Sequence, residues 1–294
     1  MTTSGNAAVL DLGRQYPEWQ PWLAIVEEVL REATDSKWDA FVTKPLPQNT
    51  KVPLLARANI LVDLTAVSRW SERLMQIAFR SGAPKMSTLS HVQYGRLNSA
   101  DLFKSSICQD SNRLRTAADG LGVDAEAFQA VALLIAVPFL QACSRHWASS
   151  IAESWLEGYC PVCGAWPAYA EVRGIERSRY LRCGRCGGAW QTRCLSCAYC
   201  GMTDHEKLLS LVPEKAGSNG AIDACKRCRG YVKTFTTLRG DPPLEVMVKD
   251  LATVDLDIVA LAQEYRRPEG AGYAVDINID SKPTFSERLL SWRR

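Results

Sequence analysis

The chain has 294 residues, of which 47% are hydrophobic and 23% charged, a composition typical of a globular protein and not of a disordered or fibrous one. This length predicts two domains. The longest apolar run has ten residues, from Val131 to Leu140, and contains Pro138. Because a spanning helix needs about 20 apolar residues, we expect no membrane span. Residues 1–13 lack the basic and apolar regions of a signal peptide, which predicts a cytoplasmic protein.

The net charge of +3 is distributed unevenly. Residues 158–240 carry thirteen Lys or Arg against six Asp or Glu, whereas the flanking segments carry a slight acidic excess. The same middle segment holds nine of the eleven cysteines, between Cys160 and Cys228. Clustered cysteines in a cytosolic chain are typical of metal sites rather than disulfides. A basic, metal-binding module is therefore predicted in the middle third.

The first half of the sequence has the 3.6-residue apolar periodicity of helices. Three helices are predicted, at Trp19–Ala33, Leu54–Arg80 and Ser99–Asp119. Asp124 is a suitable N-cap for a fourth helix that reaches Glu157, with a kink at Pro138 and Gly158 following as the C′ residue. We expect these helices to form a bundle.

After Tyr159, short β-type runs alternate with Cys-x-x-Cys turns. These runs are Arg179–Arg182, Ala189–Thr192, Leu208–Val212 and Tyr231–Leu238. Ala216–Gly220 (AGSNG) has the composition of a surface loop. A last helix is expected at about Leu244–Tyr265, and the tail after it shows no sustained period.

Together these patterns predict an α+β protein. An N-terminal helical bundle is followed by two small rubredoxin-like or zinc-ribbon metal modules and by a C-terminal helix. The expected segments are 1–158 for the helical domain, 159–190 and 191–243 for the first and second four-cysteine modules, 244–267 for the helix and 268–294 for the tail.

Four Cys-x-x-Cys pairs carry the main chemical signal. A two-residue spacer lets one tight turn direct both thiolates at one ion, and two such turns complete a tetrahedral site suited to zinc or a single iron. Four pairs therefore predict two iron or zinc ions per chain. The expected ligands are Cys160, Cys163, Cys183, Cys186, Cys197, Cys200, Cys225 and Cys228. A closed site has no open coordination position, and we find no nucleotide-binding, nucleophile or metalloprotease motif, so no catalytic residue and no enzyme activity are predicted.

The loop lengths indicate how the pairs combine. The intervals 164–182 and 201–224 are long enough for a strand-turn-strand ribbon, whereas 187–196 suits a link between modules. We therefore expect the first pair to join the second and the third to join the fourth, which also minimises loop closure. Crossed pairing is the alternative.

Cys194 extends the third pair to Cys-x-x-Cys-x-x-Cys. The run could supply three ligands of an iron–sulfur cluster, but we favour a spare thiol beside a complete site. Cys108 and Cys143 lie in helical segments and are expected to be ordinary buried thiols. The histidines have no ligand-type spacing: they are His91, His146 and His205.

The stretch Trp155-x-x-Gly-Tyr-Cys-Pro-Val-Cys-Gly resembles the FdhE family of formate dehydrogenase accessory proteins. The likeness continues through Arg179-Tyr-Leu-Arg-Cys-x-x-Cys and Trp190 to the last two cysteine pairs, the second followed by Arg-Gly-Tyr-x-Lys-Thr. It includes Lys249-Asp-Leu-Ala-Thr and covers about residues 124–268.

This resemblance implies a cytoplasmic maturation factor with a helical domain and two rubredoxin-like modules. Members of the family bind the catalytic subunit of formate dehydrogenase and assist its assembly, they bind iron, and some associate as homodimers. An accessory role for another metalloenzyme, such as a hydrogenase, is a close alternative.

Aromatic and arginine residues lie together where the helical half meets the first module. Because this composition dominates protein-binding hot spots, a partner surface is predicted at Trp155, Tyr159, Arg179 and Arg182. For the aromatic residues, packing of the helix against the ribbon is the alternative. The basic module also fits a zinc ribbon that binds nucleic acid, and an electron carrier is a third interpretation. The charge excess is modest, so we do not expect a nucleic acid partner.

Overall fold

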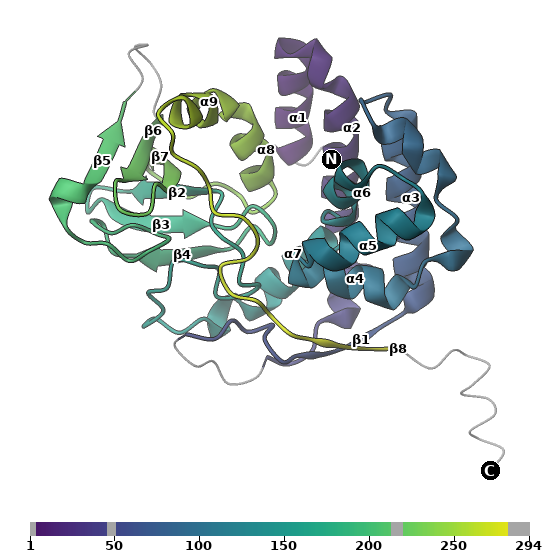
Figure 1. Cartoon of the computed structure of the whole chain (residues 1–294). Helices are drawn as coiled ribbons and strands as arrows, with labels where there is room; N and C mark the ends of the chain where they lie inside the picture. Colours follow the sequence, from purple (N-terminus) through teal and green to yellow (C-terminus); the bar gives the residue numbers. More distant parts are fainter. Residues whose placement is uncertain (1–3, 46–50, 213–219, 282–294) are drawn as a thin grey trace.

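The computed structural model describes residues 4–45, 51–212 and 220–281. A helical half and a six-stranded sheet lie side by side (Figure 1). This arrangement confirms the predicted α+β class. Part of the predicted loop 216–220 and the end of the predicted tail lie outside the described residues.

The α-helices of the described residues are α1 Ser4–Gln15, α2 Gln20–Ala33, α3 Leu64–Arg80, α4 Ser99–Cys108, α5 Ser111–Leu121, α6 Ala125–Ala132, α7 Val137–Trp147, α8 Glu245–Ala252 and α9 Val254–Ala262. The short 3-10 turns are η1 Pro17–Trp19, η2 Ser36–Phe41, η3 Met86–His91, η4 Tyr94–Arg96, η5 Ala148–Ser150 and η6 His205–Lys207. The helix predicted at Trp19–Ala33 is confirmed as α2, with the η1 turn just before it.

The helix predicted at Leu54–Arg80 is wrong over its first ten residues. Residues 59–62 form strand β1, and the helix begins only at Leu64. Asp63 fixes this start because its carboxylate accepts hydrogen bonds from the backbone amides of Thr65 and Ala66, at 2.9 and 3.2 Å. The apolar residues that were predicted to form one helix therefore belong partly to β1 and partly to α3.

Three predicted helices are each divided in two. The Ser99–Asp119 helix breaks at Gln109, which has a φ of 55°, and Asp110 caps α5 by accepting a hydrogen bond from the Arg113 amide. The helix predicted from Asp124 to Glu157 is interrupted between α6 and α7, and Pro138 occupies the first turn of α7, where its missing N–H costs nothing. Its predicted end is also wrong, because α7 ends at Trp147 and only the turn η5 follows it. The last helix is divided into α8 and α9 at Thr253.

Residues 125–150 form a 26-residue helical stretch that is long and apolar enough to cross a membrane by length and composition. Within its most apolar window, 72% is buried inside the molecule, and the break between α6 and α7 lies in its middle. Core helices of soluble proteins pass the same test, so this stretch is weak evidence for a membrane span.

The large sheet has the strand order β4-β3-β2-β7-β6-β5. Its strands are β2 Tyr169–Arg173, β3 Ser178–Arg182, β4 Ala189–Thr192, β5 Leu208–Leu211, β6 Gly220–Cys225 and β7 Tyr231–Thr237. All neighbours are antiparallel except β2 and β7, which pair in parallel from Tyr169↔Lys233 to Arg173↔Thr237. This central pair fuses the two predicted ribbons into one sheet, and the predicted boundary at 190/191 falls inside β4.

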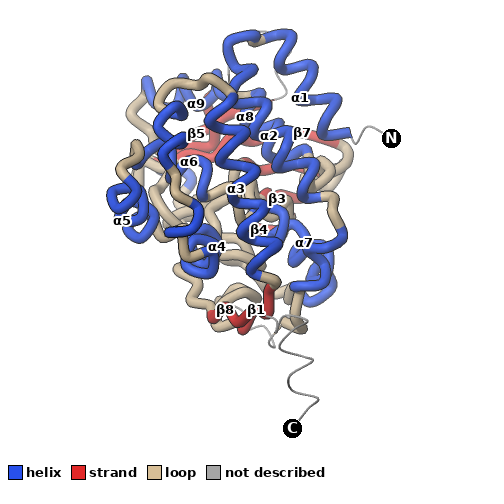
Figure 2. Tube along the Cα trace, turned by 90° about the vertical axis from the view of Figure 1, so that its right-hand side faces the viewer, coloured by secondary structure: helices blue, strands red, loops and turns tan. Residues whose placement is uncertain are grey.

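A second, two-stranded sheet lies apart from the first. Strand β1, Asn59–Val62, pairs in parallel with β8, Asn278–Ser281. Figure 2 shows this pair below the helices, away from the large sheet. The segment after α9 therefore crosses from the sheet to the helical half (Figure 1). The sequence of this segment shows no periodicity, so this path was not predicted.

One continuous cluster of buried hydrophobic residues fills the helical half and extends into the first cysteine module. It connects Phe103 of α4 and Phe139 of α7, whose rings are 5.6 Å apart, with Cys163 and Trp190 of the module. A second cluster, which includes Tyr169 among its members, lies between the sheet and helices α8 and α9. The first module thus shares its core with the helices.

Candidate metal centres

The four Cys-x-x-Cys turns have the same backbone geometry. In the first, the Cys160 amide donates to the carbonyl of Ala165 at 2.8 Å, and the Gly164 amide donates to the carbonyl of Cys160 at 2.9 Å. Equivalent pairs of hydrogen bonds of 2.8–3.0 Å close the turns that begin at Cys183, Cys197 and Cys225. These local hydrogen bonds give all four turns the same backbone path.

The residue after the second cysteine adopts a positive φ in every turn. Gly164, Gly187 and Gly201 have φ values of 73°, 69° and 67°, and Arg229 has a φ of 58° in the fourth turn. For a residue with a side chain this conformation costs about 1–3 kcal/mol. Arg229 is compensated because its guanidinium donates to the carbonyl of Gln263 at 2.9 Å and lies over the ring of Tyr265.

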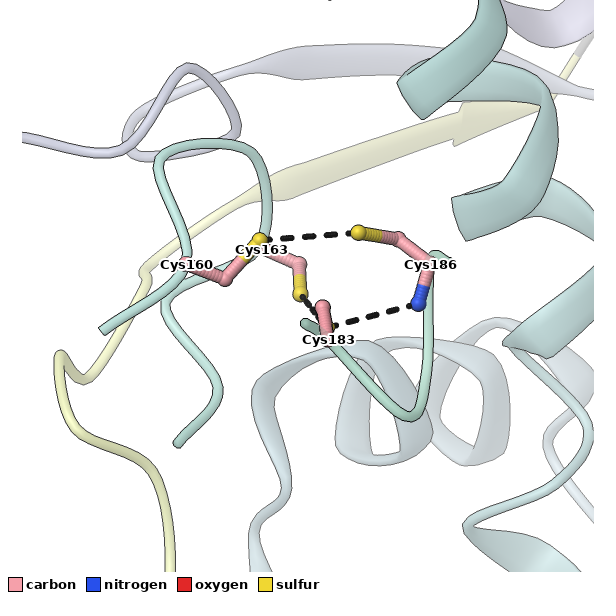
Figure 3. A group of neighbouring side chains, drawn as sticks. All are labelled: Cys160, Cys163, Cys183 and Cys186. Carbon is pink, nitrogen blue, oxygen red and sulfur yellow. Dashed lines mark hydrogen bonds between the residues drawn. The ribbon is translucent and has the colours of Figure 1, made fainter. Parts of the chain in front are cut away.

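The first candidate centre contains Cys160, Cys163, Cys183 and Cys186, whose Sγ atoms all lie within 4.8 Å of one another. The Sγ atoms of Cys160 and Cys186 are 3.5 Å apart, and those of Cys163 and Cys183 are 3.6 Å apart (Figure 3). The amide of Cys186 also donates to the Cys183 sulfur at 3.4 Å. All four residues are fully buried.

The second candidate centre contains Cys197, Cys200, Cys225 and Cys228. The Sγ atoms of Cys197 and Cys228 are 3.6 Å apart, and those of Cys200 and Cys225 are 3.8 Å apart. The structure therefore groups the pairs sequentially, as the loop lengths predict, and not in the crossed arrangement. This centre is less enclosed than the first, because Cys228 is exposed and Cys197 and Cys200 are half-buried.

The sulfur positions fit a tetrahedral metal ion. A tetrahedron with metal–sulfur bonds of about 2.3 Å has sulfur–sulfur edges of about 3.8 Å, close to the four separations given above. Burial raises the pKa of the Cys160 thiol. Four buried thiolates this close together would also repel one another, so a bound cation is needed to offset their charge. The donor set suits zinc or a single iron.

The remaining cysteines and the histidines lie outside both centres. Among the residues that the structure describes, Cys194 belongs to neither group; it is exposed, and its thiol donates to the carbonyl of Arg177 at 3.7 Å. Cys143 is fully buried, as predicted, whereas Cys108 is only partly buried. His146 lies 3.1 Å from a carboxylate oxygen of Asp39. The four-sulfur arrangement is thus complete without Cys194.

The structure corrects the predicted partner surface at Arg182. This side chain is 2% exposed, and its guanidinium donates to Glu171 at 2.9 Å, to the Asp241 carbonyl at 2.7 Å and to the Gly187 carbonyl at 3.0 Å. It therefore holds the second cysteine turn in place and presents no surface to a partner.

Arg179 requires the same correction. It is 3% exposed and donates to the carbonyl of Ser196 at 3.0 Å and to Asp223 of β6 at 3.3 Å. The side chain thereby connects the first module with the second. This role could not be predicted from neighbouring residues, because Ser196 and Asp223 are distant from Arg179 in sequence.

The aromatic residues of the predicted surface pack within the protein, which is the alternative stated for them. Trp155 is buried, and its indole donates to the Tyr159 carbonyl at 3.2 Å. Tyr159 is half-buried, donates from its hydroxyl to the carbonyl of Lys51 at 2.8 Å, and contacts the rings of Trp166 and Tyr273. Burial raises the pKa of Tyr159 to about 12.

A buried ionic network between β7 and helices α8 and α9 was not predicted. Lys233 of β7 is fully buried and lies 2.8 Å from both Asp250 of α8 and Asp257 of α9. Arg267 pairs with the same two carboxylates, at 2.7 and 2.8 Å. Lys233 and Asp250 both lie in the motifs that carry the FdhE resemblance. Their place in these motifs was the one feature of the sequence that could have indicated the network.

Comparisons with known proteins agree with this arrangement. Residues 193–272 match the family model described as FdhE, C-terminal domain. A Protein FdhE homolog of Stutzerimonas stutzeri is 34% identical over 143 residues, which is 45% of this chain and 46% of that protein. A Protein FdhE homolog of Aquifex aeolicus is 31% identical over 120 residues, 40% of this chain and 42% of that protein. The chain thus matches less than half the length of these relatives.

A solved structure extends the similarity of fold to nearly the whole chain. The crystal structure of the FdhE protein from Pseudomonas aeruginosa has a TM-score of 0.54 and 19% sequence identity, and the match covers 92% of this chain and 94% of that one. At this identity the likeness concerns the fold alone. The family model, the relatives and this structure together confirm the resemblance to the FdhE family.

Proposed function

Starting from the confirmed resemblance to the FdhE family, we propose that this protein is an accessory factor that binds the catalytic subunit of formate dehydrogenase in the cytoplasm and assists its assembly. The observation that carries the proposal is the pair of four-sulfur centres, built by the motif residues of the resemblance. Their closed geometry leaves no ligand position for a substrate or a water molecule, so the protein is expected to act by binding and to catalyse no reaction.

The eight cysteines of the two centres would hold two iron or zinc ions per chain. A bound ion would cross-link two turns. In small metal modules the free energy of metal binding is part of the free energy of folding. The residues of this chain bring the thiols together in two groups of four and donate backbone hydrogen bonds to them, such as that from the Cys186 amide to the Cys183 sulfur.

We place the surface that binds the subunit on helix α9, because the arginines predicted for this role are buried. Ile258, Val259 and Leu261 of α9 are 60%, 43% and 54% exposed. Neighbouring exposed apolar side chains of this size are typical of protein interaction sites. A second copy of this chain is the competing occupant, since the resemblance also implies homodimers.

The test is capture of the catalytic subunit by the tagged full chain, from cells that make formate dehydrogenase. The paired change Ile258→Lys and Leu261→Lys should lower the captured amount at least about tenfold, because two hot-spot losses exceed 1.4 kcal/mol together. Gln263→Lys, an exposed position next to the helix, is the matched control and should capture normally. Undiminished capture by the paired variant rejects this surface, and no capture by the unaltered chain argues against the function.

Binding of nucleic acid is supported less well by the structure. Most arginines of the first module that would contact phosphates have protein partners: for example, Arg173 pairs with Glu171, and Arg185 donates to the carbonyls of Ser106 and Ile107. Their charge is therefore used within the fold, which favours the accessory function over this alternative.

A further inference from the structure

We infer that the metal ions of the two centres differ in how readily they are released. A ligand from solution can approach the second centre at Cys228 and remove its ion, whereas the first centre retains its ion. The ligand class is a divalent cation that prefers sulfur, such as zinc or iron in its reduced form. The inference rests on the metal binding proposed above and adds a different role for each centre.

The first centre is enclosed on every side that the structure describes. Loop residues of the helical half cover its first turn, because the amides of Leu54 and Leu55 donate to the carbonyls of Pro161 and Val162 at 2.8 and 3.0 Å. The crossing segment after α9 covers the same turn: a Cβ added at Gly164 would lie 2.5 Å from the carbonyl oxygen of Tyr273. Chain segments distant in sequence must move before anything reaches these sulfurs.

The second turn of the first centre is equally covered. A Cβ added at Gly187 would lie 2.6 Å from Pro243 and 2.9 Å from the side-chain oxygen of Gln141 in α7. Arg185 in this turn donates to the carbonyls of Ser106, Ile107 and Leu133. Release of an ion from this centre therefore requires local opening of the main core.

The second centre has the opposite surroundings. Cys228 is exposed, and a Cβ added at Gly201 would meet nothing within 4 Å. Cys197 and Cys225 line a cavity of about 170 Å³ that also contains Cys194. Although Cys225 of this centre is buried, an incoming ligand can reach Cys228 without any rearrangement of the core.

The charge around Cys228 favours an anionic incoming ligand. Lys226 and Arg227 lie in the same turn and are exposed, whereas Arg229, the residue after Cys228, is also exposed but pairs with Glu264 at 3.2 Å. Ligands that compete for such an ion are thiolates or polycarboxylates, and cationic side chains raise the local concentration of anions. The bond between the ion and the Cys228 sulfur breaks as the bond to the incoming donor forms; the sulfur leaves as a thiolate, and no electron is transferred.

The experiment measures zinc release from the full chain loaded with zinc, into an excess of EDTA, with the freed metal quantified over time. One equivalent should leave in a fast phase and one in a phase roughly 100-fold slower or more, because only the slow release needs local unfolding. Cys228→Ser removes one ligand of the second centre, so the fast equivalent of zinc should be released sooner or should not bind at all. The slow equivalent should be released at an unchanged rate. Cys194→Ser is the control and should alter neither phase.

Alkylation of the zinc-loaded protein with iodoacetamide identifies the centres independently. Peptide mass spectrometry should find Cys194 and Cys228 modified, and the cysteines of the first centre protected. Release of two equivalents in a single phase, or loss of the slow equivalent in Cys228→Ser, would overturn the inference. Fewer than two equivalents in the loaded protein would instead overturn the proposed metal binding, and the inference with it.

Discussion

Arg182 of β3 and Glu171 of β2 form an ion pair at 2.9 Å in which both side chains are almost completely buried, at 2% and 0% exposed. Glu171 lies on the strand that joins the two modules, since β2 pairs with β7, and Arg182 also donates to the carbonyls of Gly187 and Asp241. A buried charge that loses its partner is destabilising because its desolvation is no longer compensated. The pair is therefore part of the framework of the first centre.

Replacement of Arg182 by Met should lower the free energy of unfolding by about 3 kcal/mol, because the carbonyls of Gly187 and Asp241 lose a buried donor and Glu171 keeps only Arg173 as its cationic partner. Urea unfolding followed by circular dichroism measures this change. Arg193→Met, at an exposed position, is the matched control and should change stability by less than about 0.5 kcal/mol. Equal effects of the two substitutions would contradict the structural role of Arg182.

The two centres should differ in what unfolds when one of them is lost. The first centre shares its buried cluster with α4 and α7, so Cys183→Ser should reduce the helical circular dichroism of the whole chain at the growth temperature. Cys225→Ser removes a ligand at the end of β6, outside that cluster, and should leave the helical signal nearly unchanged. A structural zinc site supplies an apparent ~10–16 kcal/mol of folding free energy, enough to make the difference visible in thermal melts.

An unchanged helical signal in Cys183→Ser would mean that the helices do not depend on the first centre, and loss of the signal in Cys225→Ser would mean that they depend on the second centre as well. Metal content should be measured on each sample, since each variant is expected to lose one equivalent. A variant that retains both equivalents would contradict the assignment of its cysteine as a ligand.

The Lys233 network gives a prediction about pH. Burial opposes ionisation of Asp250, but Arg267 and Lys233 outweigh it and hold the pKa of this carboxyl below its usual 3.8. A carboxyl with a lowered pKa in the folded state stabilises the protein above its unfolded pKa and loses this contribution as the pH falls through the folded value. Asp250→Asn should therefore cost about 2–3 kcal/mol at pH 7, and the same amount at pH 5.

The measurement is the difference in the free energy of unfolding between the unaltered chain and Asp250→Asn, at pH 7, 6 and 5. Asp255→Asn, an exposed carboxyl on α9, serves as the control and should cost little at any of these values. A penalty that shrinks between pH 7 and pH 5 would contradict a lowered pKa for Asp250.

The sequence predicted those parts of the protein that depend on neighbouring residues. The cysteine turns are closed by backbone hydrogen bonds within six residues, so their spacing was sufficient to predict them and, with the loop lengths, their grouping. Helix α2 has a continuous apolar face and was also predicted. These features need no knowledge of the remainder of the fold.

The features that were missed depend on contacts between distant residues. The parallel pair β2–β7 joins residues about 60 positions apart, and β1 pairs with β8 across the whole chain. Arg179 and Arg182 were assigned to a partner surface because arginine beside aromatic residues is typical of protein-binding hot spots. Their burial is explained only by Glu171 and Asp223, which the fold brings beside them.

The central claim is the accessory role, and the most direct test is formate dehydrogenase activity in cells that lack this protein. Deletion should abolish or strongly lower the activity while the catalytic subunit is still made, and the unaltered gene supplied in trans should restore it. The Cys183→Ser variant should fail to restore it if the first centre is required for the fold. Full formate dehydrogenase activity in the deletion strain, with hydrogenase and other metalloenzymes also unimpaired, would contradict the account.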